Sequence, residues 1–409
     1  MTTTNEHMIR ARDAALIWSR LAEPGDRAAG TIVDHLGLVE SLDWLSGHLK
    51  GVPGTQSLTG LLDDLGVHHP GQRKKLGEHV DRWAVRWGGL DLAKDQRAVE
   101  QLGATLIVRG DPRWPTALDD LAEQAPFCLW VRGNPDLSDY QERGVSIVGA
   151  RAASAYGEHV TATMVAELVG RGHPIVSGGA YGIDAVAHRA TLASHGKTVA
   201  IMAGGIDQLY PVGNTRLLHE VMAQGGAIIS ELPPGAVPSR VRFLRRNRLI
   251  AALTKVTVVV EAAWRSGTLS TANHAFELGR VVGAVPGPVT SVQSAGCHRL
   301  LKESAAQCVT DAQDVIELAG FATNQQANRD GDHEAQGELD LGSRITDSLN
   351  PIEKLVFDVL SPRTLRTLDQ VAAHAGVTMG EAMAAVGKLE SRAIIERVGY
   401  KWRRLNYRN

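Results

Sequence analysis

The chain has 409 residues, of which 44% are hydrophobic and 22% charged, and this composition excludes wholesale disorder and a fibrous protein. At about 100 to 200 residues per domain, such a length predicts two to four domains. The 43 Lys and Arg residues nearly balance the 45 Asp and Glu residues, for a net charge of -2. Any surface that binds a polyanion must therefore be local.

No targeting, membrane-spanning or metal-binding pattern is visible. Met1 to Arg20 carries scattered charges, and no later run approaches the roughly 20 apolar residues that cross a bilayer. The three cysteines, Cys128, Cys297 and Cys308, are odd in number and lack CxxC spacing. We therefore expect a cytoplasmic protein with no membrane partner, no disulfide framework, no metal and no cofactor.

The N-terminal part has the apolar spacing of short helices. Leucine, isoleucine and alanine recur at helical intervals over residues 8–85, and Gly and Pro pairs such as Pro24-Gly25 break the pattern. The pattern predicts a small helical domain over residues 1–87.

From Ala104 onward the sequence consists of short apolar runs rich in β-branched residues, which alternate with amphipathic stretches. The runs are TLIV, CLWV, SIVG, PIVS, TVAIM, AIIS, VTVVV and VVGAV. Strands that alternate with helices of about a dozen residues predict a parallel sheet covered by helices. The fold class is thus α/β, with a Rossmann-like core over residues 88–318.

The remaining residues predict a linker and a second small domain. Acidic and polar residues dominate 319–349, which indicates a solvated linker. Over 350–409, Pro351 favours a helix start, and Thr378-Met379-Gly380-Glu381 forms a capping box at the start of a second helix after the turn Gly376-Val377. With a basic hairpin around Gly399, the pattern predicts a winged-helix domain.

Two Gly-rich or Arg-bearing turns follow neighbouring predicted strands. The strand SIVG leads to Arg151, and the strand PIVS leads to the turn Ser177–Gly182, which contains Gly178 and Gly179. Backbone N–H groups at such strand-to-helix turns form a cradle for an anion, phosphate above all. A tight turn without a ligand is the competing interpretation. Neither turn matches a dinucleotide or Walker motif, so use of a dinucleotide or ATP is not indicated.

The strongest local signal is a basic run without acids. No Asp or Glu occurs between Glu231 and Glu261, and that interval contains Arg240, Arg242, Arg245, Arg246, Arg248 and Lys255, together with Asn247. Arginine binds phosphate oxygens in a bidentate manner, so the run predicts a polyanion site. A solvated surface with incidental ion pairs is the alternative.

A third anion site is predicted at Arg265-Ser266-Gly267, between a buried strand and a helical stretch. Asp184, Asp207, Glu231, Glu261 and Glu277 could act as acids or bases, but a carboxylate at a strand end is usually a cap or an ion-pair partner. We therefore predict no catalytic residue.

Taken together, these motifs make the segment from about Thr105 to Ile316 resemble the DprA/Smf DNA-processing proteins. The resemblance runs in order through LIVRGDPRWPTAL, VSIVGARAASAYG, PIVSGGAYGIDAVAHRA, RFLRRNRLIAAL and VTVVVEAAWRSGTLSTANHAFELGR. It implies an extended Rossmann fold that binds single-stranded DNA in a basic pocket, forms a homodimer and helps to load RecA recombinase in recombination or DNA uptake. It implies no established enzymatic activity. The N-terminal helices resemble the SAM-type or helix-hairpin-helix extensions of such proteins.

The resemblance also assigns site residues. The family's GSR-like turn corresponds to Arg151, its RNR motif to Arg246-Asn247-Arg248, and its SGS-like turn to Ser266-Gly267-Thr268. A basic pocket residue corresponds to Arg240. This sequence departs from the family's pattern at four positions: Gly179, Val212, Leu244 and His298. Relatives can carry a basic residue at the position of Val212, and Arg242 or Arg245 would take over its phosphate contact here.

Two other functions stay open on the sequence. A phosphoribohydrolase-like enzyme has a similar fold class, although the stretch Trp264–Thr271 lacks that class's paired glycines and nearby Glu. A winged-helix regulator of duplex DNA is the second alternative. Its predicted recognition helix offers few Asn or Gln side chains for base edges, which makes direct readout poor.

Overall fold

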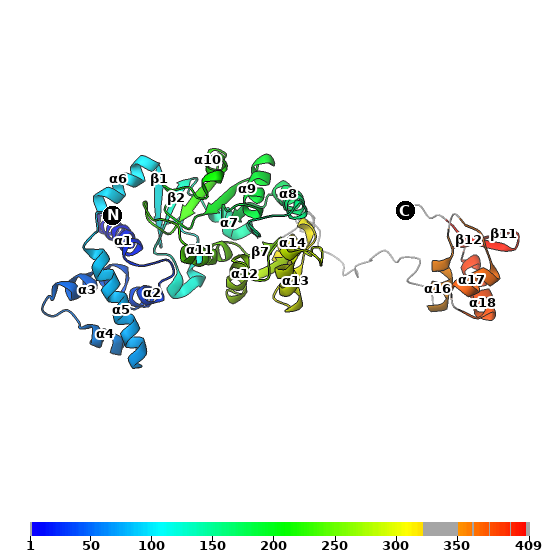
Figure 1. The fold of residues 1–409 in the computed structure, drawn as a ribbon, viewed down its shortest axis with the longest axis horizontal. Coiled ribbons are helices and arrows are strands. Elements are labelled where there is room, and N and C mark those ends of the chain that lie inside the picture. Colours follow the sequence, from blue (N-terminus) through cyan, green and yellow to red (C-terminus); the bar gives the residue numbers. More distant parts are fainter. Residues whose placement is uncertain (1, 322–350, 362–363, 376, 393, 406–409) are drawn as a thin grey trace. The chain divides into compact units, whose positions relative to one another are not determined.

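The computed structural model describes residues 2–321, 351–361, 364–375, 377–392 and 394–405. The chain divides into two compact units, residues 1–327 and 328–409, shown in Figure 1. The helices predicted as a domain over residues 1–87 belong to the first unit. No helix in the described ranges is long and apolar enough to cross a membrane.

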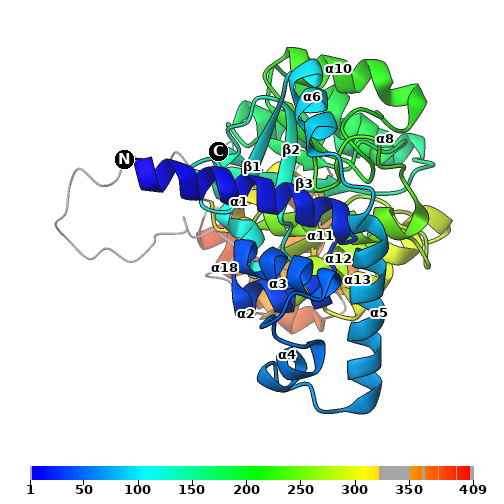
Figure 2. The ribbon, with the colours of Figure 1, turned by 90° about the vertical axis from the view of Figure 1, so that its left-hand side faces the viewer.

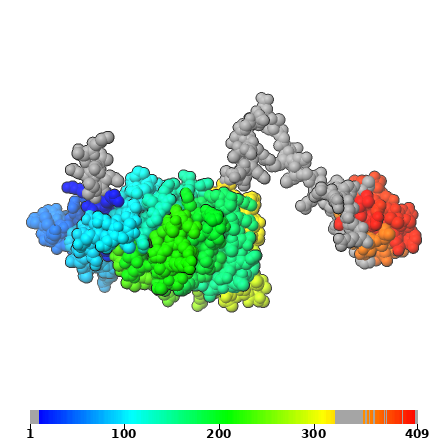
Figure 3. All heavy atoms as spheres, turned by 90° about the horizontal axis from the view of Figure 1, so that it is seen from above, coloured from blue at the N-terminus to red at the C-terminus, as the bar shows by residue number. Residues whose placement is uncertain are grey.

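Six helices precede the sheet, as the helical spacing predicts. They are α1 (Thr2–Leu21), α2 (Arg27–Leu36), α3 (Leu38–Lys50), α4 (Leu58–Asp64), α5 (Pro70–Trp87) and α6 (Leu92–Leu102). Their shared core is built around Trp18 and Trp83, whose rings meet edge to face at 5.2 Å, a favourable arrangement for aromatic pairs. Figure 3 shows these helices packed directly against the rest of the first unit.

The sheet has nine strands in the order β1-β2-β6-β5-β4-β3-β7-β8-β9. Their bounds are β1 (Ala104–Val108), β2 (Cys128–Gly133), β3 (Val145–Val148), β4 (Ile175–Ser177), β5 (Thr198–Ile201), β6 (Ala227–Ser230), β7 (Val256–Val259), β8 (Val281–Ala284) and β9 (Gln307–Cys308). The strands from β3 onward pair in parallel, as predicted. By contrast, β2 pairs antiparallel with both of its neighbours, β1 and β6, and the consecutive antiparallel strands β1 and β2 need no crossover helix between them.

Helices cover both faces of the sheet. They are α7 (Ser138–Arg143), α8 (Ala155–Gly170), α9 (Ile183–Ala193), α10 (Thr215–Ala223), α11 (Arg240–Leu253), α12 (Thr268–Glu277), α13 (Ala295–Lys302) and α14 (Ala312–Ala319). Strand β7 shows why both faces are apolar. Val256 and Val258 pack with residues of α8 and α14, and Val259 packs with those of α11 and α12 on the other face, because successive side chains of a strand alternate.

The N-terminal helix α1 lies over the antiparallel edge of the sheet, as Figure 2 shows. Ala15 and Leu16 of α1 share a buried cluster with Leu106, Val108 and Trp130 of β1 and β2. One face of the outer strands is thereby shielded from water.

The order of the strands creates a crevice between β3 and β7. After β3 the chain builds β4, β5 and β6 on one side, and α11 then returns it to β7 on the other side. The loops that follow β3 and β7 diverge at this point. In open α/β sheets, ligands bind at the carboxyl ends of the strands where the order reverses in this way.

The second unit contains the elements predicted for the C-terminal part. They are α16 (Pro351–Val359), β10 (Arg366–Thr367), α17 (Leu368–Ala375), α18 (Met379–Ser391), β11 (Ile395–Val398) and β12 (Lys401–Arg404). Thr378 and Glu381 form the predicted capping box, and Gly399, with φ +67°, lies between the two hairpin strands. The predicted linker residues 322–349 lie outside the described residues.

Candidate functional site: an anion pocket at the strand ends

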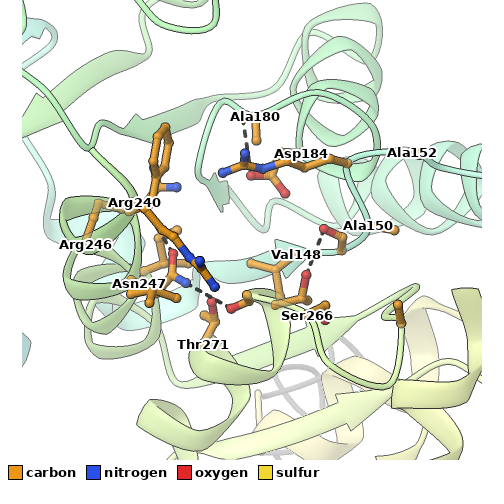
Figure 4. A pocket seen from close by; sticks show the side chains of 18 of the residues that line it. Val148, Ala150, Ala152, Ala180, Asp184, Arg240, Arg246, Asn247, Ser266 and Thr271 are labelled. Atoms are coloured by element: carbon orange, nitrogen blue, oxygen red, sulfur yellow. Dashed lines mark hydrogen bonds between the residues drawn. The ribbon is translucent and has the colours of Figure 1, made fainter. Parts of the chain in front are cut away.

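A cavity of about 1040 Å³ lies at the carboxyl ends of the central strands. It is lined by the loop after β3, by Ala180 and Asp184 after β4, by α11 and by the start of α12. Figure 4 shows Arg240 and Asn247 on one side of this cavity, Asp184 and Ala180 on another, and Ser266 and Thr271 on a third. The predicted turns and the start of the basic run thus meet in one place. We call this cavity the switch-point pocket.

The Gly-rich turn after β4 does not present a free phosphate cradle. Its N–H groups at Gly178 and Ala180 donate to the Asp184 carboxylate, at 3.2 and 3.4 Å. Burial raises the pKa of Asp184, although the nearby Arg246 charge and these hydrogen bonds act to lower it. Ser177 donates its hydroxyl to the carbonyl of Ile147 instead of facing the cavity. The chain's own carboxylate occupies the anion position that the sequence predicts for phosphate.

The glycines of this turn serve close packing. A Cβ at Gly178 would lie 2.6 Å from a guanidinium nitrogen of Arg246. Gly182, with φ +74°, has the carbonyl oxygen of Ala150 2.2 Å from the position of a Cβ, so only glycine fits against the loop after β3. Neither Gly178 nor Gly179 lines the cavity.

Two residues of the RNR motif hold the walls of the pocket together. Arg246 donates from Nη1 to the carbonyl of Gly178 at 2.8 Å and also to the carbonyl of Ile201. Burial lowers its pKa to about 10, so it remains a cation at neutral pH. Asn247 donates to the carbonyl of Gly267 at 3.1 Å. These side chains join the ends of β4 and β5 and anchor the start of α12.

Arg248, the third residue of this motif, lies outside the switch-point pocket. Its guanidinium donates to both carboxylate oxygens of Glu231 at 2.6 Å, and its side chain is 2% exposed. It also donates to the carbonyls of Gln124 and Arg245. The prediction that Arg248 contacts phosphate is therefore at odds with its place in the interior.

The middle of the basic run contacts the N-terminal segment, which neutralises the charge of Arg242 and accepts a hydrogen bond from Arg245. Arg242 forms two hydrogen bonds with the Glu23 carboxylate, both at 3.0 Å, and Arg245 donates to the carbonyl of Pro24 at 2.7 Å. Burial acts to raise the pKa of Glu23, but hydrogen bonds and charge from Arg242 and Arg86 lower it below the usual value. Neither Arg242 nor Arg245 lines the switch-point pocket, so neither replaces a basic residue at Val212.

Three exposed arginines remain as cations at the pocket: Arg151, Arg240 and Arg265. None of them forms an ion pair within the described part of the chain. Beside them, α12 begins at Gly267 without a side-chain cap, and the buried hydroxyl of Ser266 has no hydrogen-bond partner among the described residues. A helix N-terminus with free donors and nearby guanidinium groups attracts an anion.

An aromatic pair that is not among the predicted site residues also lines the pocket. Phe243 and Tyr210 both line it, with their ring centroids 5.6 Å apart, and the guanidinium of Arg151 lies 4.7 Å from the Phe243 ring centroid. An aromatic side chain inside a run of arginines is the signal that could have pointed to Phe243, because bases stack on such rings. The Arg242 partner Glu23 has no comparable signal in the sequence.

The fold and site define an α/β protein with a cationic, aromatic-lined pocket at a switch point of its sheet. The sequence model of the family described as DNA recombination-mediator protein A matches residues 105–320. A putative DNA processing protein DprA of Mycobacterium tuberculosis is 38% identical over 395 residues, which cover 94% of this chain and 92% of the relative. The chain belongs to this DNA-processing family.

More distant relatives and a solved structure agree. Protein Smf of Escherichia coli is 36% identical over 257 residues, 59% of this chain and 68% of that protein. The X-ray structure of DNA processing protein A from Streptococcus pneumoniae covers 68% of this chain and 96% of its own, with 30% identity and a TM-score of 0.53. These comparisons confirm the predicted resemblance.

Proposed function

We propose that this protein binds single-stranded DNA in the switch-point pocket, without sequence preference and without making or breaking a bond. The observation that carries the proposal is the set of arginines that form no ion pair among the described residues, Arg151, Arg240 and Arg265, around the start of α12, where Gly267 provides no side-chain cap. Phosphates are the anions that this arrangement suits. Phosphate contacts carry no sequence information, which accounts for the lack of preference.

Bases have a place in the same pocket. The exposed ring of Tyr210 and the half-buried ring of Phe243 provide an aromatic surface beside the phosphate donors. Base stacking on such rings contributes about 1 to 3 kcal/mol per base and tolerates any sequence. A duplex hides its base faces, so single strands are favoured over duplex DNA.

The test compares binding of single-stranded and duplex oligonucleotides of varied sequence by fluorescence anisotropy. We expect tighter binding of single strands and similar affinities across sequences. Arg240→Ala and Arg265→Ala should each weaken binding and reduce the magnitude of the log–log salt slope by about 0.7. Arg216→Ala is the control, because Arg216 is 92% exposed, pairs with its helix neighbour Glu220 and does not line the pocket. Unchanged affinity and slope in both pocket variants would refute the proposal.

An assay for release of a free base from nucleoside monophosphates, run on the same preparations, tests the enzyme alternative. Turnover that Asp184→Asn abolishes would replace the binding proposal by phosphoribohydrolase activity. We expect none, because Asp184 is buried and already accepts two backbone hydrogen bonds.

Further roles follow from the family resemblance and remain part of this proposal. The protein acts in the cytoplasm, forms a homodimer through the core, and helps to load RecA on single strands during recombination or natural transformation. Sedimentation equilibrium of the full chain tests the dimer. A RecA filament assay on protein-coated single strands tests the loading, and Arg240→Ala should reduce the stimulation in proportion to its weaker binding.

The second unit is proposed to be a winged-helix domain that is dispensable for basal single-strand binding. Its helices α17 and α18 and the hairpin β11–β12 supply the elements of such a domain. A chain that ends at residue 321 should retain the affinity of the parent for single strands. If this shorter chain folds but no longer binds single strands, the DNA site is not confined to the first unit, and the proposal is wrong on this point.

A further inference from the structure

A second cavity, of about 430 Å³, lies where the N-terminal helices meet the core. Its lining comes from the start of α2, from His79 of α5, from Gln124, and from α11 and α12. Leu244 lines both this junction cavity and the switch-point pocket, so the two cavities adjoin at this residue. Ser270 faces the junction cavity, and its neighbour on α12, Thr271, faces the other.

The junction cavity carries uncompensated positive charge. Arg27 is exposed and has no partner within the described ranges, and Arg245 bonds only to the carbonyl of Pro24. The charge of Arg248 is matched by Glu231. Arg27 and Arg245 come from segments far apart in the sequence, yet they border the same cavity.

The one carboxylate in the lining is already engaged. Asp26 accepts hydrogen bonds from the N–H groups of Ala28 and Ala29 at 3.1 and 3.4 Å. It also contacts His79 Nδ1 at 3.0 Å and accepts from the Trp83 indole at 3.3 Å. Asp26 therefore serves as the cap of α2, and its single negative charge can offset at most one of the two guanidinium groups in the lining.

We infer that the junction cavity is a second phosphate subsite for the strand whose first part occupies the switch-point pocket. Two guanidinium groups beside one cavity repel each other unless an anion lies between them. A DNA single strand that leaves the switch-point pocket past Leu244 would bring its next phosphates to the junction cavity, between Arg27 and Arg245. This inference rests on the proposed function and adds the path of the strand and the participation of the N-terminal helices.

The test measures the affinity of oligothymidylates of increasing length for the full chain. Short oligomers that fill only the switch-point pocket should bind parent and Arg27→Ala equally. Longer oligomers should bind Arg27→Ala about two- to five-fold more weakly, as for one exposed ion pair, with a salt slope smaller by about 0.7. Arg97→Ala is the control, because Arg97 is exposed, unpaired within the described segments and outside both cavities.

A pair of opposite substitutions at Ser270 separates charge from folding. Ser270→Glu should weaken binding of long oligomers, and Ser270→Lys should strengthen it. Near the start of α12 a Glu stabilises the helix and a Lys destabilises it, so an effect that acts through helix stability would have the opposite sign. Inorganic phosphate bound in the junction cavity should compete with long oligomers and spare short ones, whereas a site for free phosphate alone would leave the binding of both unchanged.

The outcomes are distinct for the two proposals. If long and short oligomers respond equally to Arg27→Ala and to both Ser270 variants, the subsite is refuted and the switch-point pocket stands. If the parent binds no single strand of any length, both proposals fail.

Discussion

Arg240 and Arg248 lie on the same helix, α11, but the structure gives them different roles. Arg248 is buried and makes a bidentate pair with Glu231, whereas Arg240 is exposed at the switch-point pocket. We expect Arg248→Ala to lower the free energy of unfolding of the first unit by about 3 to 5 kcal/mol, because it leaves a buried carboxylate without its partner. Arg240→Ala should change that free energy by less than about 0.5 kcal/mol.

The magnitude follows from what Arg248 supplies. Its removal takes away the two hydrogen bonds that the Glu231 carboxylate accepts from Arg248. The carbonyls of Gln124 and Arg245 each lose a hydrogen-bond donor as well. A buried acceptor that loses its partner costs about 1 to 3 kcal/mol, and more when it is charged. Replacing both charges together, as Arg248→Met with Glu231→Leu, should recover most of the loss, since a hydrophobic pair of similar volume often matches a buried ion pair.

Urea titration followed by circular dichroism measures these differences, and anisotropy with single strands measures binding on the same samples. Arg240→Ala should lose affinity at unchanged stability, and Arg248→Ala should lose stability. An Arg248→Ala protein as stable as the parent but unable to bind single strands would refute this reasoning, since it would make Arg248 a DNA contact in place of a structural one.

Three further expectations follow from single groups. Burial raises the pKa of the thiols of Cys128 and Cys297 to about 12, so a maleimide at pH 8 should label exposed Cys308 quickly and those two only after denaturation; rapid labelling of all three would contradict the buried positions. The pKa of Glu23 lies below its ordinary value of 4.5 because arginine contacts outweigh the effect of burial, so its stabilising effect is present above pH 4.5 and is lost on acidification. The stability deficit of Glu23→Gln should therefore shrink as the pH falls from 7 to 4, and a constant deficit would count against the ion pair. Gly182→Ala should destabilise the first unit and weaken single-strand binding, because a Cβ there meets the loop after β3; wild-type melting and affinity would show that the turn tolerates a side chain.

Eight of the nine strands of the large sheet, the family and the position of a pocket at the strand ends could be predicted from the sequence alone, whereas the short strand β9 was not predicted. The β-branched runs became strands because a strand buried on both faces has few compatible side chains, as β7 with Val256, Val258 and Val259 illustrates. The capping box at Thr378 and Glu381 could also be predicted from the sequence, because its hydrogen bonds join residues that are close in the chain. Arg151 and Arg265 were placed correctly at strand ends, where parallel strands bring such turns together.

Which arginines lack an ion pair among the described residues could not be predicted locally, because it depends on contacts between distant segments. The run from Arg240 to Arg248 contains no acid, yet Glu231 and Glu23 reach it from other segments, and Asp184 fills the anion position of the Gly-rich turn. Local sequence predicts a local charge excess, but neutralisation depends on distances between segments that are remote in the chain. Burial then favours the pairing of those charges, because an isolated charge in the interior costs several kcal/mol.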